Sequence, residues 1–532
     1  MERFATLLDR LVFTPQRLGK LRLLRDYVTE APDPDRGYAI AAITRDLDLP
    51  SVKPALLRGL VEERTDPVLF ALSYDYVGDL AETISLIWGD APDRAETPAL
   101  SEVVARLQSV SRSEAPAVIA AYLDRMPPPA RYAMLKLATG GMRVGVSARL
   151  AKQALADWGG VDVTEIEELW HGLSPPYESL FAWLDGRAPK PEQAAKAPFR
   201  PVMLANPVEE GDLDGRPPGD YLAEWKWDGI RVQATVEDGV RRLYSRTGDE
   251  ISGAFPDLVG AMAFEGAIDG ELLVARPGPE GTIVGTFSEL QERLNRKSVS
   301  ARLLASHPAF LRAYDLLSAD GVDLGALPFQ DRRHRLEAFV ARLDPQRFDL
   351  SELVPFESWA EIARLRTAPP HPVIEGLMLK RRDSAYLPGR PKGPWFKWKK
   401  DPHIIDAVLM YAQRGHGKRS SFYSDYTFGV WDAEGALVPV GKAYFGFTDD
   451  ELKQLDKFVR DETVDRYGPV RAVRAEPERG LVLEIAFEGL QRSTRHKSGL
   501  AMRFPRISRL RWDKPPAEAD RLETLARLLP AG

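Results

Sequence analysis

The stretch AEWKWDGIR, residues 223–231, sets one lysine between two tryptophans, with carboxylates on both sides and a glycine directly after. In extended backbone alternate side chains point to opposite faces, so Glu224, Lys226 and Asp228 share one face and the two tryptophans take the other. Gly229 then permits a sharp turn or the close approach of a ligand. The pattern predicts a strand whose tryptophans are buried while its lysine points into a cleft.

Lys226 is a candidate nucleophile. A lysine in a partly dry cleft beside other cations loses proton affinity, and a neutral amine attacks electrophiles. A surface strand with a Glu–Lys ion pair explains this short stretch equally well. The residues that follow along the chain therefore have to decide between the two interpretations.

Length and composition limit the possible architectures and chemistries. With 532 residues the chain exceeds a single hydrophobic core, and several domains of roughly 100–200 residues each are expected. No cysteine is present, which excludes disulfides, thiolate zinc sites and cysteine nucleophiles. The 7 histidines are scattered, so any metal is expected to be a hard cation held by carboxylates and phosphate.

The hydropathy pattern and the amino terminus indicate a cytoplasmic protein. No apolar run approaches the roughly 18 residues that cross a bilayer. The first segment, MERFATLLDRLVF, carries charged residues where a secretory signal would be apolar.

The net charge of −6 conceals two basic blocks, residues 381–400 and 492–514, each of which contains a single acidic residue. Aromatic residues are interleaved with the basic ones in both blocks. Solvated loops explain either block alone. Two such blocks together favour a surface that contacts phosphates.

The period of the apolar residues divides the chain into domains. Residues 1–185 repeat apolar residues at spacings of three and four and predict an all-α domain. Residues 186–201 are rich in Pro, Ala and charge and predict a linker. Residues 202–400 alternate short strands with helices, which predicts a mixed, largely antiparallel α/β domain. Residues 401–532 predict an all-β barrel of the OB kind with one helix.

Further segments with chemically active residues follow in order: LYSRTGDE with Arg246, IDGELL with Glu271, FLRAYDLL with Tyr314, EGLMLK with Glu375 and Lys380, WFKWKK with Lys397 and Lys399, and RWDK with Arg511 and Lys514. Each segment alone has a structural explanation, but their order and separations are hard to explain by coincidence. Together with KWDGIR they resemble the nucleotidyltransferase motifs of ATP-dependent DNA ligases.

The resemblance extends over nearly the whole chain. LSYDYVGDLAET, residues 72–83, and LKLATGGMRVGVS, residues 135–147, are similar to the helical DNA-binding domain of three-domain ligases. GLQRSTRHKSGLAMRFPRI, residues 489–507, is similar to their OB-fold domain. The sequence thus resembles the bacterial ATP-dependent type, with an N-terminal DNA-binding domain, an adenylation (nucleotidyltransferase) domain and an OB-fold domain.

The resemblance implies an enzyme that seals nicks between a 5′-phosphate and a 3′-hydroxyl in duplex DNA, in repair, replication or recombination. Lys226 would attack the α-phosphorus of ATP, expel pyrophosphate and hold AMP as a phosphoramidate. The AMP would pass to the 5′-phosphate of the nick, and the 3′-hydroxyl would displace it from this DNA-adenylate. Negative charge builds up around phosphorus in each transfer, so the site needs positive charge aimed at it.

The resemblance also implies cationic contacts to ATP. Lys397 and Lys399 alternate on a strand and would face the phosphates. Arg231 and Arg246 would steady the ribose and phosphates, or the 5′-phosphate of the nick. For Lys380 a role in the site and a solvent-facing position are both open.

The nucleobase and the metal are assigned to four further residues by the resemblance. Tyr314, where a phenylalanine is common in the family, would stack on adenine, and Glu224 would accept from the adenine amino group. Glu271 and Glu375 would bind Mg²⁺, or Mn²⁺ in its place, although Glu271 can instead hold the ribose hydroxyls.

Arg511 and Lys514 lie more than a hundred residues beyond the other ATP-binding candidates. They would reach the β- and γ-phosphates only if the OB domain closes over the cleft, as the resemblance implies. A hinge at residues 400–402 is expected, because the strand and the basic run end there.

DNA would be held through its backbone. Gly140 and Gly141 precede an expected helix, so backbone N–H groups and Arg143 can approach phosphates closely, although a tight turn between helices also explains the glycines. Arg503 and Arg506 in the second basic block would add contacts. With no base-reading pattern, we expect a monomer that encircles nicked double-stranded DNA and binds it less tightly as salt increases. The sequence identifies no helicase, nuclease or clamp partner.

Four alternatives share parts of this pattern. An RNA ligase or an mRNA-capping guanylyltransferase also uses a Lys-x-Asp-Gly lysine, but the large helical domain argues against both. An NAD-dependent ligase generally carries a cysteine zinc finger, which this chain lacks. A non-catalytic DNA-binding scaffold is disfavoured because all the matched catalytic residue types are present.

Overall fold

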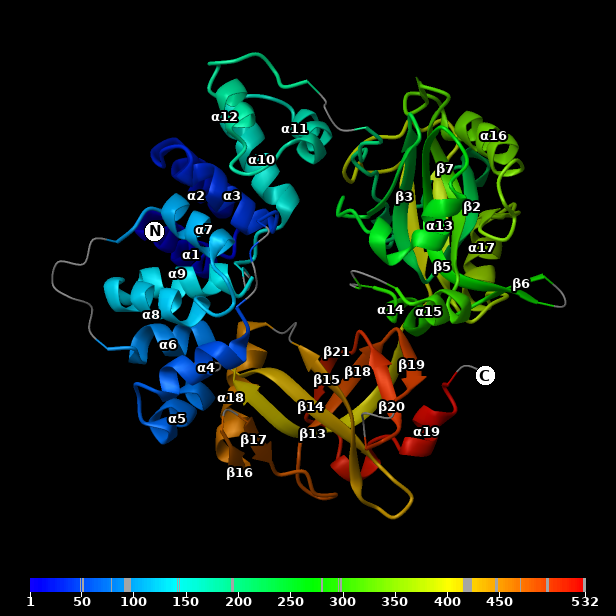
Figure 1. The fold of residues 1–532 in the computed structure, drawn as a ribbon. Helices are drawn as coiled ribbons and strands as arrows, with labels where there is room; N and C mark the ends of the chain where they lie inside the picture. Colours follow the sequence, from blue (N-terminus) through cyan, green and yellow to red (C-terminus); the bar gives the residue numbers. More distant parts are fainter. Residues whose placement is uncertain are drawn as a thin grey trace. The chain divides into compact units, whose positions relative to one another are not determined.

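The structure is a computed structural model of the chain (Figure 1). It describes all residues except 48, 50–51, 78, 90–96, 141, 143, 193–195, 279–280, 295, 297–298, 415–422, 445–447, 469, 494–496 and 530–532. Two compact units make up the chain, one formed by residues 1–147 and 401–532 and the other by Ala148–Lys400. None of the helices in the described parts has the length and apolar character that crossing a bilayer requires.

The first 147 residues form helices, as the spacing of apolar residues predicts. These are α1 (Glu2–Phe13), α2 (Arg17–Glu30), α3 (Asp35–Thr44), α4 (Pro54–Glu62), α5 (Pro67–Val77), α6 (Leu80–Ile87), α7 (Leu100–Ser109), α8 (Ala115–Arg125) and α9 (Pro128–Ala138). α1 buries Leu8 and Leu11 and packs against α2 and α9. The Asp79 side chain caps α6 and pairs with Lys136 of α9 at 2.5 Å, which ties these two helices together.

The carboxyl-terminal part of the first unit is mostly strand. It contains β13 (His403–Arg414), β14 (Tyr423–Trp431), β15 (Leu437–Tyr444), α18 (Asp449–Asp461), β16 (Thr463–Tyr467), β17 (Val470–Val473), β18 (Val482–Phe487), β19 (Gly489–Arg492), β20 (Leu500–Arg503), β21 (Arg506–Arg511), the 3₁₀ turn η5 (Pro516–Glu518) and α19 (Leu522–Ala526). β19 and β20 form a separate hairpin.

A five-stranded barrel closes within this part. The main sheet runs β14-β15-β21-β18-β13, and β13 also pairs with β14, so the first and last strands of this series meet. The core of the barrel contains Tyr426, Phe428 and Ile485. Leu455 and Val459, one helical turn apart on α18, are buried in the same core. The predicted OB-type barrel is therefore confirmed, and the short helix α19 is present in addition to the one predicted helix.

The second unit begins with α10 (Ala148–Gly159), α11 (Val163–Leu169), η1 (Trp170–Gly172) and α12 (Glu178–Leu184). The strands that follow are β1 (Asn206–Pro207), β2 (Tyr221–Trp227), β3 (Ile230–Glu237), β4 (Val240–Ser245), β5 (Gly266–Gly278), β6 (Gly281–Val284), β7 (Ala309–Ala319), β8 (Val322–Asp323), β9 (Phe348–Leu350), β10 (Leu353–Val354), β11 (Ile374–Arg381) and β12 (Trp395–Lys399). Between them lie η2 (Pro218–Asp220), η3 (Ser252–Ala254), α13 (Pro256–Ala261), α14 (Phe287–Gln291), α15 (Ala301–Ser306), α16 (Phe329–Val340) and α17 (Trp359–Thr367).

Two sheets form the body of the second unit. The first has the order β1-β12-β11-β2-β10, and the second has β4-β3-β5-β7-β8, with β6 on β5 and β9 on β7. Among the described strands of this unit, the pairings are antiparallel except β1 with β12 and β7 with β9, and an isolated parallel bridge joins Met203 and Gly389. α16 packs against β7 and α17 against β11. The predicted mixed, largely antiparallel α/β domain is confirmed.

A layer of apolar residues lies where the two sheets face each other. Leu222 of the first sheet, Ala267 and Leu317 of the second, and Phe329 and Trp395 belong to this one cluster. Leu222 is on the same face of β2 as Glu224 and Lys226, because strand residues two apart share a face. This face of β2 therefore points toward the second sheet.

Candidate active site

Lys226 lies on β2 next to β11, and β11 separates it from β12. In the register of the sheet, Gly376 of β11 is opposite Lys226 on one side and opposite Lys399 on the other. Lys226 donates from Nζ to Oε1 of Glu375 at 2.5 Å, and Lys399 Nζ lies 2.8 Å from Oε2 of the same carboxylate. One carboxylate therefore bridges two lysines from strands that do not pair with each other.

A break in strand register aims Glu375 at the lysines. The pairing of β11 with β2 shifts between Ile374 and Gly376, and such bulges redirect side chains. Gly376 has φ +151, and a Cβ there would lie 2.3 Å from the carbonyl oxygen of Trp398. Only glycine lets β12 come this close.

The tryptophans of the opening stretch have different surroundings. Trp225 packs with Tyr221 and Leu377 in the cluster under α17. Trp227 packs with Leu273, and the guanidinium of Arg312 lies 4.1 Å from its ring centre. Both tryptophans are half-buried, so the predicted alternation of faces is present but the predicted burial is incomplete.

Two carboxyl groups close to Lys226 differ in their affinity for protons. Burial, with a smaller contribution from the charge of Glu375, raises the pKa of Glu271 to about 7 against the opposing charge of Lys226. Burial also acts to raise the pKa of Glu375, but Lys226 and Lys399 outweigh it, and this pKa lies below its ordinary value. The Gly229 N–H donates to Glu271 Oε1 at 3.2 Å.

Positive charge gathers around Lys226. Burial lowers the pKa of Lys397, and the nearby charges of Arg390, Lys226, Lys399 and Arg246 lower it further. Within the described part of the chain, no carboxylate pairs with Lys397, and Arg246 is exposed. Such an excess of cations suits a ligand with several negative charges, for example a polyphosphate.

The available oxygen donors decide which metal the site can accept. The described residues contain no group of three or more His, Cys, Asp or Glu side chains arranged to hold an ion. Glu271 and Glu375 offer carboxylate oxygens, which suit Mg²⁺, and Mg²⁺ commonly binds through one or two carboxylates together with phosphate oxygens and water. The donor set therefore fits a metal that arrives with a phosphorylated ligand.

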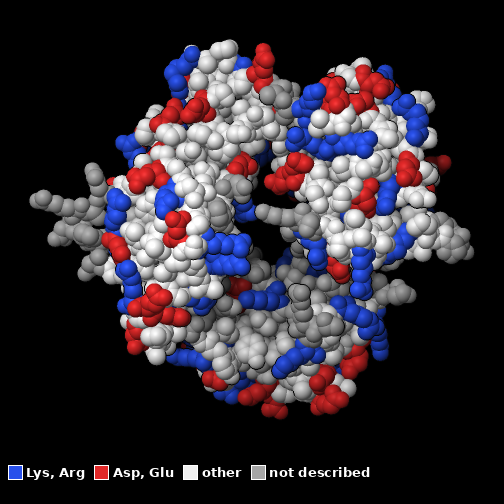
Figure 2. Space-filling view, viewed as in Figure 1, with Lys and Arg blue, Asp and Glu red and all other residues white. Residues whose placement is uncertain are grey.

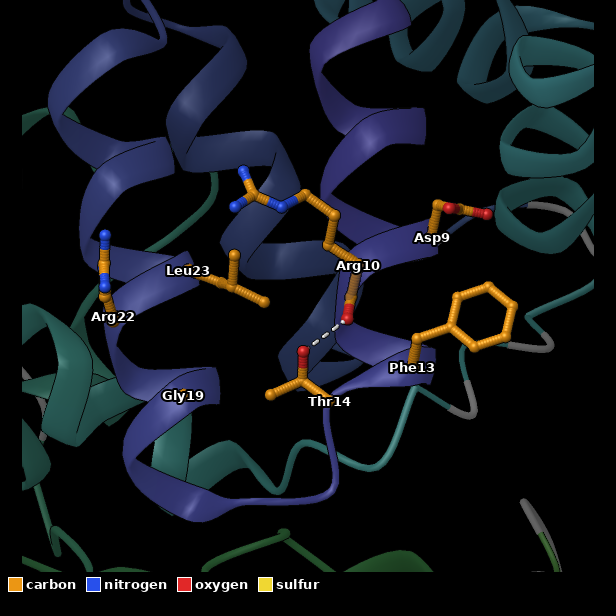
Figure 3. Close-up of a pocket in the computed structure, with 7 residues that line it drawn as sticks. All are labelled: Asp9, Arg10, Phe13, Thr14, Gly19, Arg22 and Leu23. Atoms are coloured by element: carbon orange, nitrogen blue, oxygen red, sulfur yellow. Dashed lines mark hydrogen bonds between the residues drawn. The ribbon is translucent and has the colours of Figure 1, made fainter.

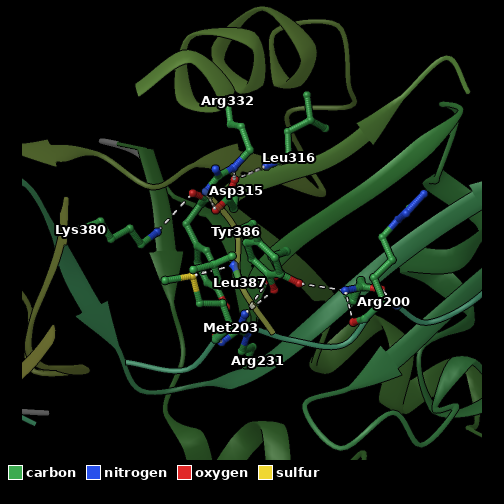
Figure 4. Close-up of polar contacts among 12 residues, drawn as sticks. Arg200, Met203, Arg231, Asp315, Leu316, Arg332, Lys380, Tyr386 and Leu387 are labelled. Carbon is green, nitrogen blue, oxygen red and sulfur yellow. Dashed lines mark hydrogen bonds and ion pairs between the residues drawn. The ribbon is translucent and has the colours of Figure 1, made fainter. Parts of the chain in front are cut away.

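Arg231 is held by protein groups (Figure 4). Its Nη1 donates to the Met203 carbonyl at 2.5 Å, and its Nη2 donates to Asp269 Oδ2 at 2.6 Å and to Tyr386 Oη at 2.9 Å. The Tyr386 hydroxyl donates to the same Asp269 oxygen at 2.5 Å. Asp269 is completely buried, so the ion pair with Arg231 compensates a charge that water cannot reach.

Lys380 is buried, so the interpretation in which its side chain faces solvent is wrong. Its side chain is 1% exposed, and Nζ donates to Glu224 Oε2 at 2.8 Å and to the Tyr314 carbonyl at 3.3 Å. Nζ also lies 4.5 Å from the centre of the Tyr314 ring. The other oxygen of Glu224 accepts from Arg333 Nη1 at 3.0 Å. Lys380 thus connects the two residues predicted to contact the nucleobase.

Arg511 and Lys514 belong to the first unit, at the end of β21 and just beyond it. Lys514 Nζ lies 2.7 Å from Asp406 Oδ2, and Arg511 Nη1 lies 3.3 Å from the same oxygen. Arg511 also pairs with Asp513 at 2.9 Å, and this hydrogen bond lowers the pKa of Asp513 to about 2. Both cations therefore have carboxylate partners within their own unit.

The structure describes three of the five residues that are predicted to contact DNA, namely Gly140, Arg503 and Arg506. Gly140 follows α9 with φ +68 and donates its N–H to the Leu137 carbonyl at 3.2 Å, which is a helix-ending turn. Gly141 and Arg143 lie outside the described residues. Arg506, on β21, is exposed. Arg503, on β20, is half-buried, and its guanidinium lies 5.5 Å from the ring centre of Phe504.

Surface charge is divided into patches. In Figure 2, Lys and Arg side chains form separate clusters on the visible face, with Asp and Glu side chains between them.

A pocket of about 380 Å³ between α1 and α2 is lined by Asp9, Arg10, Phe13, Thr14, Gly19, Arg22 and Leu23 (Figure 3). None of the predicted site residues lines this pocket.

The network around Lys226 includes residues that sequence reasoning missed. Arg333 and Tyr386 gave no signal, because their partners are distant in sequence, as Glu224 is from Arg333. Gly376 carried a usable signal, since a glycine inside a strand pattern often marks a bulge or a close approach of backbone. Asp269 lies two residues before Glu271 on the same strand, so its inward direction could have been predicted.

Comparisons with known proteins agree with this fold. Residues 202–399 match the model of the ATP dependent DNA ligase domain, and residues 419–514 match that of the ATP dependent DNA ligase C terminal region. A protein named Probable DNA ligase from Koribacter versatilis is 34% identical over 482 residues, which are 85% of this chain and 81% of that protein. Another Probable DNA ligase, from Rhodococcus opacus, is 31% identical over 519 residues, 92% of this chain and 97% of the relative.

A solved structure called Pmar-Lig_PreS3 shares the fold. It has a TM-score of 0.59 at 14% sequence identity, with 96% of this chain and 99% of that chain covered. The two-sheet α/β domain and the small barrel correspond to the two matched ligase regions, so the chain has a nucleotidyltransferase fold. The chain belongs to the family of ATP-dependent DNA ligases.

Proposed function

We propose that the chain seals nicks in duplex DNA that carry a 5′-phosphate and a 3′-hydroxyl, through a lysine-AMP intermediate on Lys226 and a DNA-adenylate. The observation that carries the proposal is the position of the Lys226 amine, 2.5 Å from Glu375 and surrounded by other cations. Repair, replication or recombination would supply the nicks.

In the first step the nitrogen of Lys226 attacks the α-phosphorus of ATP. An N–P bond forms, the bond from phosphorus to the bridging oxygen breaks, and the electron pair leaves with pyrophosphate. Glu375 Oε1 is within hydrogen-bond distance of the amine and can accept the proton that Lys226 has to lose. AMP is then transferred to the 5′-phosphate, and attack by the 3′-hydroxyl releases it.

Stabilisation of charge is the main demand of each step. Lys397, Lys399 and Arg246 carry positive charge near Lys226 and would bind the phosphates. Mg²⁺ held by Glu271 and Glu375 would neutralise phosphate charge when bound. Arg511 and Lys514 stay proposed contacts of the β- and γ-phosphates.

The nucleobase would lie against Tyr314, with its amino group directed to Glu224. Arg231, fixed by Asp269 and Tyr386, would steady the ribose and phosphates or the 5′-phosphate of the nick. A ring stacks on adenine through its π-face, whereas a carboxylate accepts the amino hydrogens. Together these contacts would favour ATP over GTP.

We propose four segments with separate tasks: a helical DNA-binding domain (1–185), a linker (186–201), an adenylation domain (202–400) and an OB-fold domain (401–532). Gly140, Gly141 and Arg143 would contact the DNA backbone from the first segment, and Arg503 and Arg506 from the last. The active species would be a monomer on nicked DNA. No sequence-specific contact is required.

Covalent labelling tests the proposal. Incubation with α-labelled ATP and Mg²⁺, followed by denaturing electrophoresis, should label the wild-type chain, and GTP should not. Lys226→Ala should abolish labelling, whereas Lys457→Ala, at an exposed position on α18, should not alter it. Sealing of a nicked duplex should follow the same pattern. Labelling of Lys226→Ala would show that the nucleophile is another residue.

A further inference from the structure

A buried series of ion pairs and hydrogen bonds connects α16 to the residues that are predicted to contact the nucleobase. Arg333 donates from Nε to Glu337 Oε1 at 3.0 Å and from Nη1 to Glu224 Oε1 at 3.0 Å. The other oxygen of Glu224 accepts from Lys380, which also donates to the carbonyl of Tyr314. The contacts therefore run from the surface of α16 to Tyr314 without a break.

The side chains in the middle of this series of contacts are shielded from water. The side chains of Arg333, Glu224 and Lys380 are 5%, 2% and 1% exposed, and rings of Phe329 and Trp395 lie 4.8 Å from the Lys380 ammonium. Buried ions of this kind are costly, and apolar side chains of equal volume often stabilise a fold as well or better. A role beyond stability would account for their presence.

The geometry leaves Glu224 able to accept further hydrogen bonds. Each carboxylate oxygen has about two acceptor positions, and on Glu224 one cation occupies one position on each oxygen. A third donor, such as an amino group on a purine, can still bind. A carbonyl oxygen at the same place on the purine would face a negative charge and be repelled.

We propose that Arg333 is a positioning residue that makes the site selective for a 6-aminopurine nucleotide. It fixes one oxygen of Glu224 from α16 while Lys380 fixes the other, so that the carboxylate is held where the amino group of adenine arrives. This inference rests on the proposed function, because it takes the ligand to be ATP. Arg333 itself need not touch the nucleotide.

The test compares ATP with purine riboside triphosphate, which has hydrogen in place of the 6-amino group. Formation of the covalent adduct is followed by intact-protein mass spectrometry, which distinguishes the two nucleotides by mass, and yields kcat/KM for each. The variants are Arg333→Met and, as a matched control on the same helix, Arg335→Met, since Arg335 is exposed.

A hydrogen bond to a charged group corresponds to a preference of roughly 10- to 100-fold. Wild type and Arg335→Met are expected to prefer ATP by this factor, and Arg333→Met should lose most of the preference. If Arg333→Met lowers kcat/KM equally for both nucleotides, Arg333 has only a structural role and the inference is overturned. Absence of a preference in the wild type would also overturn it, because Glu224 would then not recognise the amino group.

One further measurement and one further variant distinguish an effect of the substitution on folding from an effect on nucleotide preference. The unfolding midpoint of each variant is recorded, and if Arg333→Met is unfolded at the assay temperature, Arg333→Lys takes its place, with a partial loss of preference expected because the charge remains but the forked geometry does not. If the folded wild type forms no adduct with either nucleotide, the proposed function fails and this inference fails with it. An adduct without a change of preference in the variants overturns the inference alone.

Discussion

Lys226 and Lys399 share one carboxylate although β11 separates their strands. Each lysine donates to a different oxygen of Glu375, at 2.5 Å and 2.8 Å. The nucleophile candidate and a phosphate-binding candidate are thus aligned by a single side chain at a bulge. Loss of the Glu375 side chain should therefore change the positions of both lysines.

Glu375→Gln keeps the shape of the side chain but removes its charge. The two lysines would then repel each other without compensation, and the proton acceptor of Lys226 would be lost. We expect the rate of adduct formation to fall roughly 100-fold or more. Single-turnover labelling with ATP measures it. Glu352→Gln, at an exposed position, is the control and should stay close to wild type.

The pH dependence of the free energy of unfolding should reveal the raised pKa of Glu271. Its folded pKa is about 7, above the ordinary value of 4.5. Between these pH values the folded chain keeps a proton that the unfolded chain releases, so the free energy of unfolding should fall as pH rises, by up to about 3 kcal/mol. Denaturant unfolding of wild type and Glu271→Gln in chelator-containing buffer checks this. Equal pH slopes in the two proteins would contradict the assignment.

Tyr386→Phe removes the hydroxyl that contacts both Arg231 and Asp269. We expect a loss of about 1–3 kcal/mol in the free energy of unfolding, since a buried charged network loses a hydrogen-bonding member. Chemical denaturation measures this loss. Tyr467→Phe, at a residue that is 58% exposed, should change stability by less than about 0.5 kcal/mol.

Gly376→Ala and Gly260→Ala should have opposite effects. At Gly376 the φ of +151 and the nearby Trp398 carbonyl oppose a side chain, and we expect a destabilisation of about 1–3 kcal/mol together with slower adduct formation. At Gly260, inside α13, a Cβ meets nothing within 4 Å, and alanine should stabilise by up to about 1 kcal/mol. Thermal and denaturant unfolding compare them. Similar effects of both substitutions would refute the close-packing argument.

Arg506 should contribute to the salt dependence of DNA binding. If it contacts one phosphate, Arg506→Ala should reduce the slope of log affinity against log salt concentration by about 1. Binding of a nicked duplex at several salt concentrations measures the slope. Arg527→Ala, at another exposed arginine, provides the comparison and should leave the slope unchanged.

The element types and the position of the nucleophile candidate were predictable because they depend on local periodicity. Spacing of three and four along α1 buries one face of that helix, and alternation along β2 assigns its side chains to two faces, and neither pattern requires knowledge of distant residues. The two faces of β2 follow from the same rule. The motif order then identified the family.

Pairings between distant residues could not be predicted in this way. Glu224 meets Arg333 and Lys380 109 and 156 residues further along the chain, and no local pattern encodes such meetings. The bulge that aims Glu375 depends on the register of three strands. The partial exposure of Trp225 and Trp227 depends on which helices and loops cover their faces.

The pairing of β13 with β14 has a consequence for behaviour at high concentration. Four pairings of the ring are continuous ladders, and β15 meets β21 at one residue pair, so most backbone groups of the ring have partners and few are left for pairing with a neighbouring molecule. β16 lies at the end of the sheet beyond the ring, and there the charged side chains of Asp465 and Arg466 are exposed. Charges at an open edge disfavour pairing with the strand of another molecule.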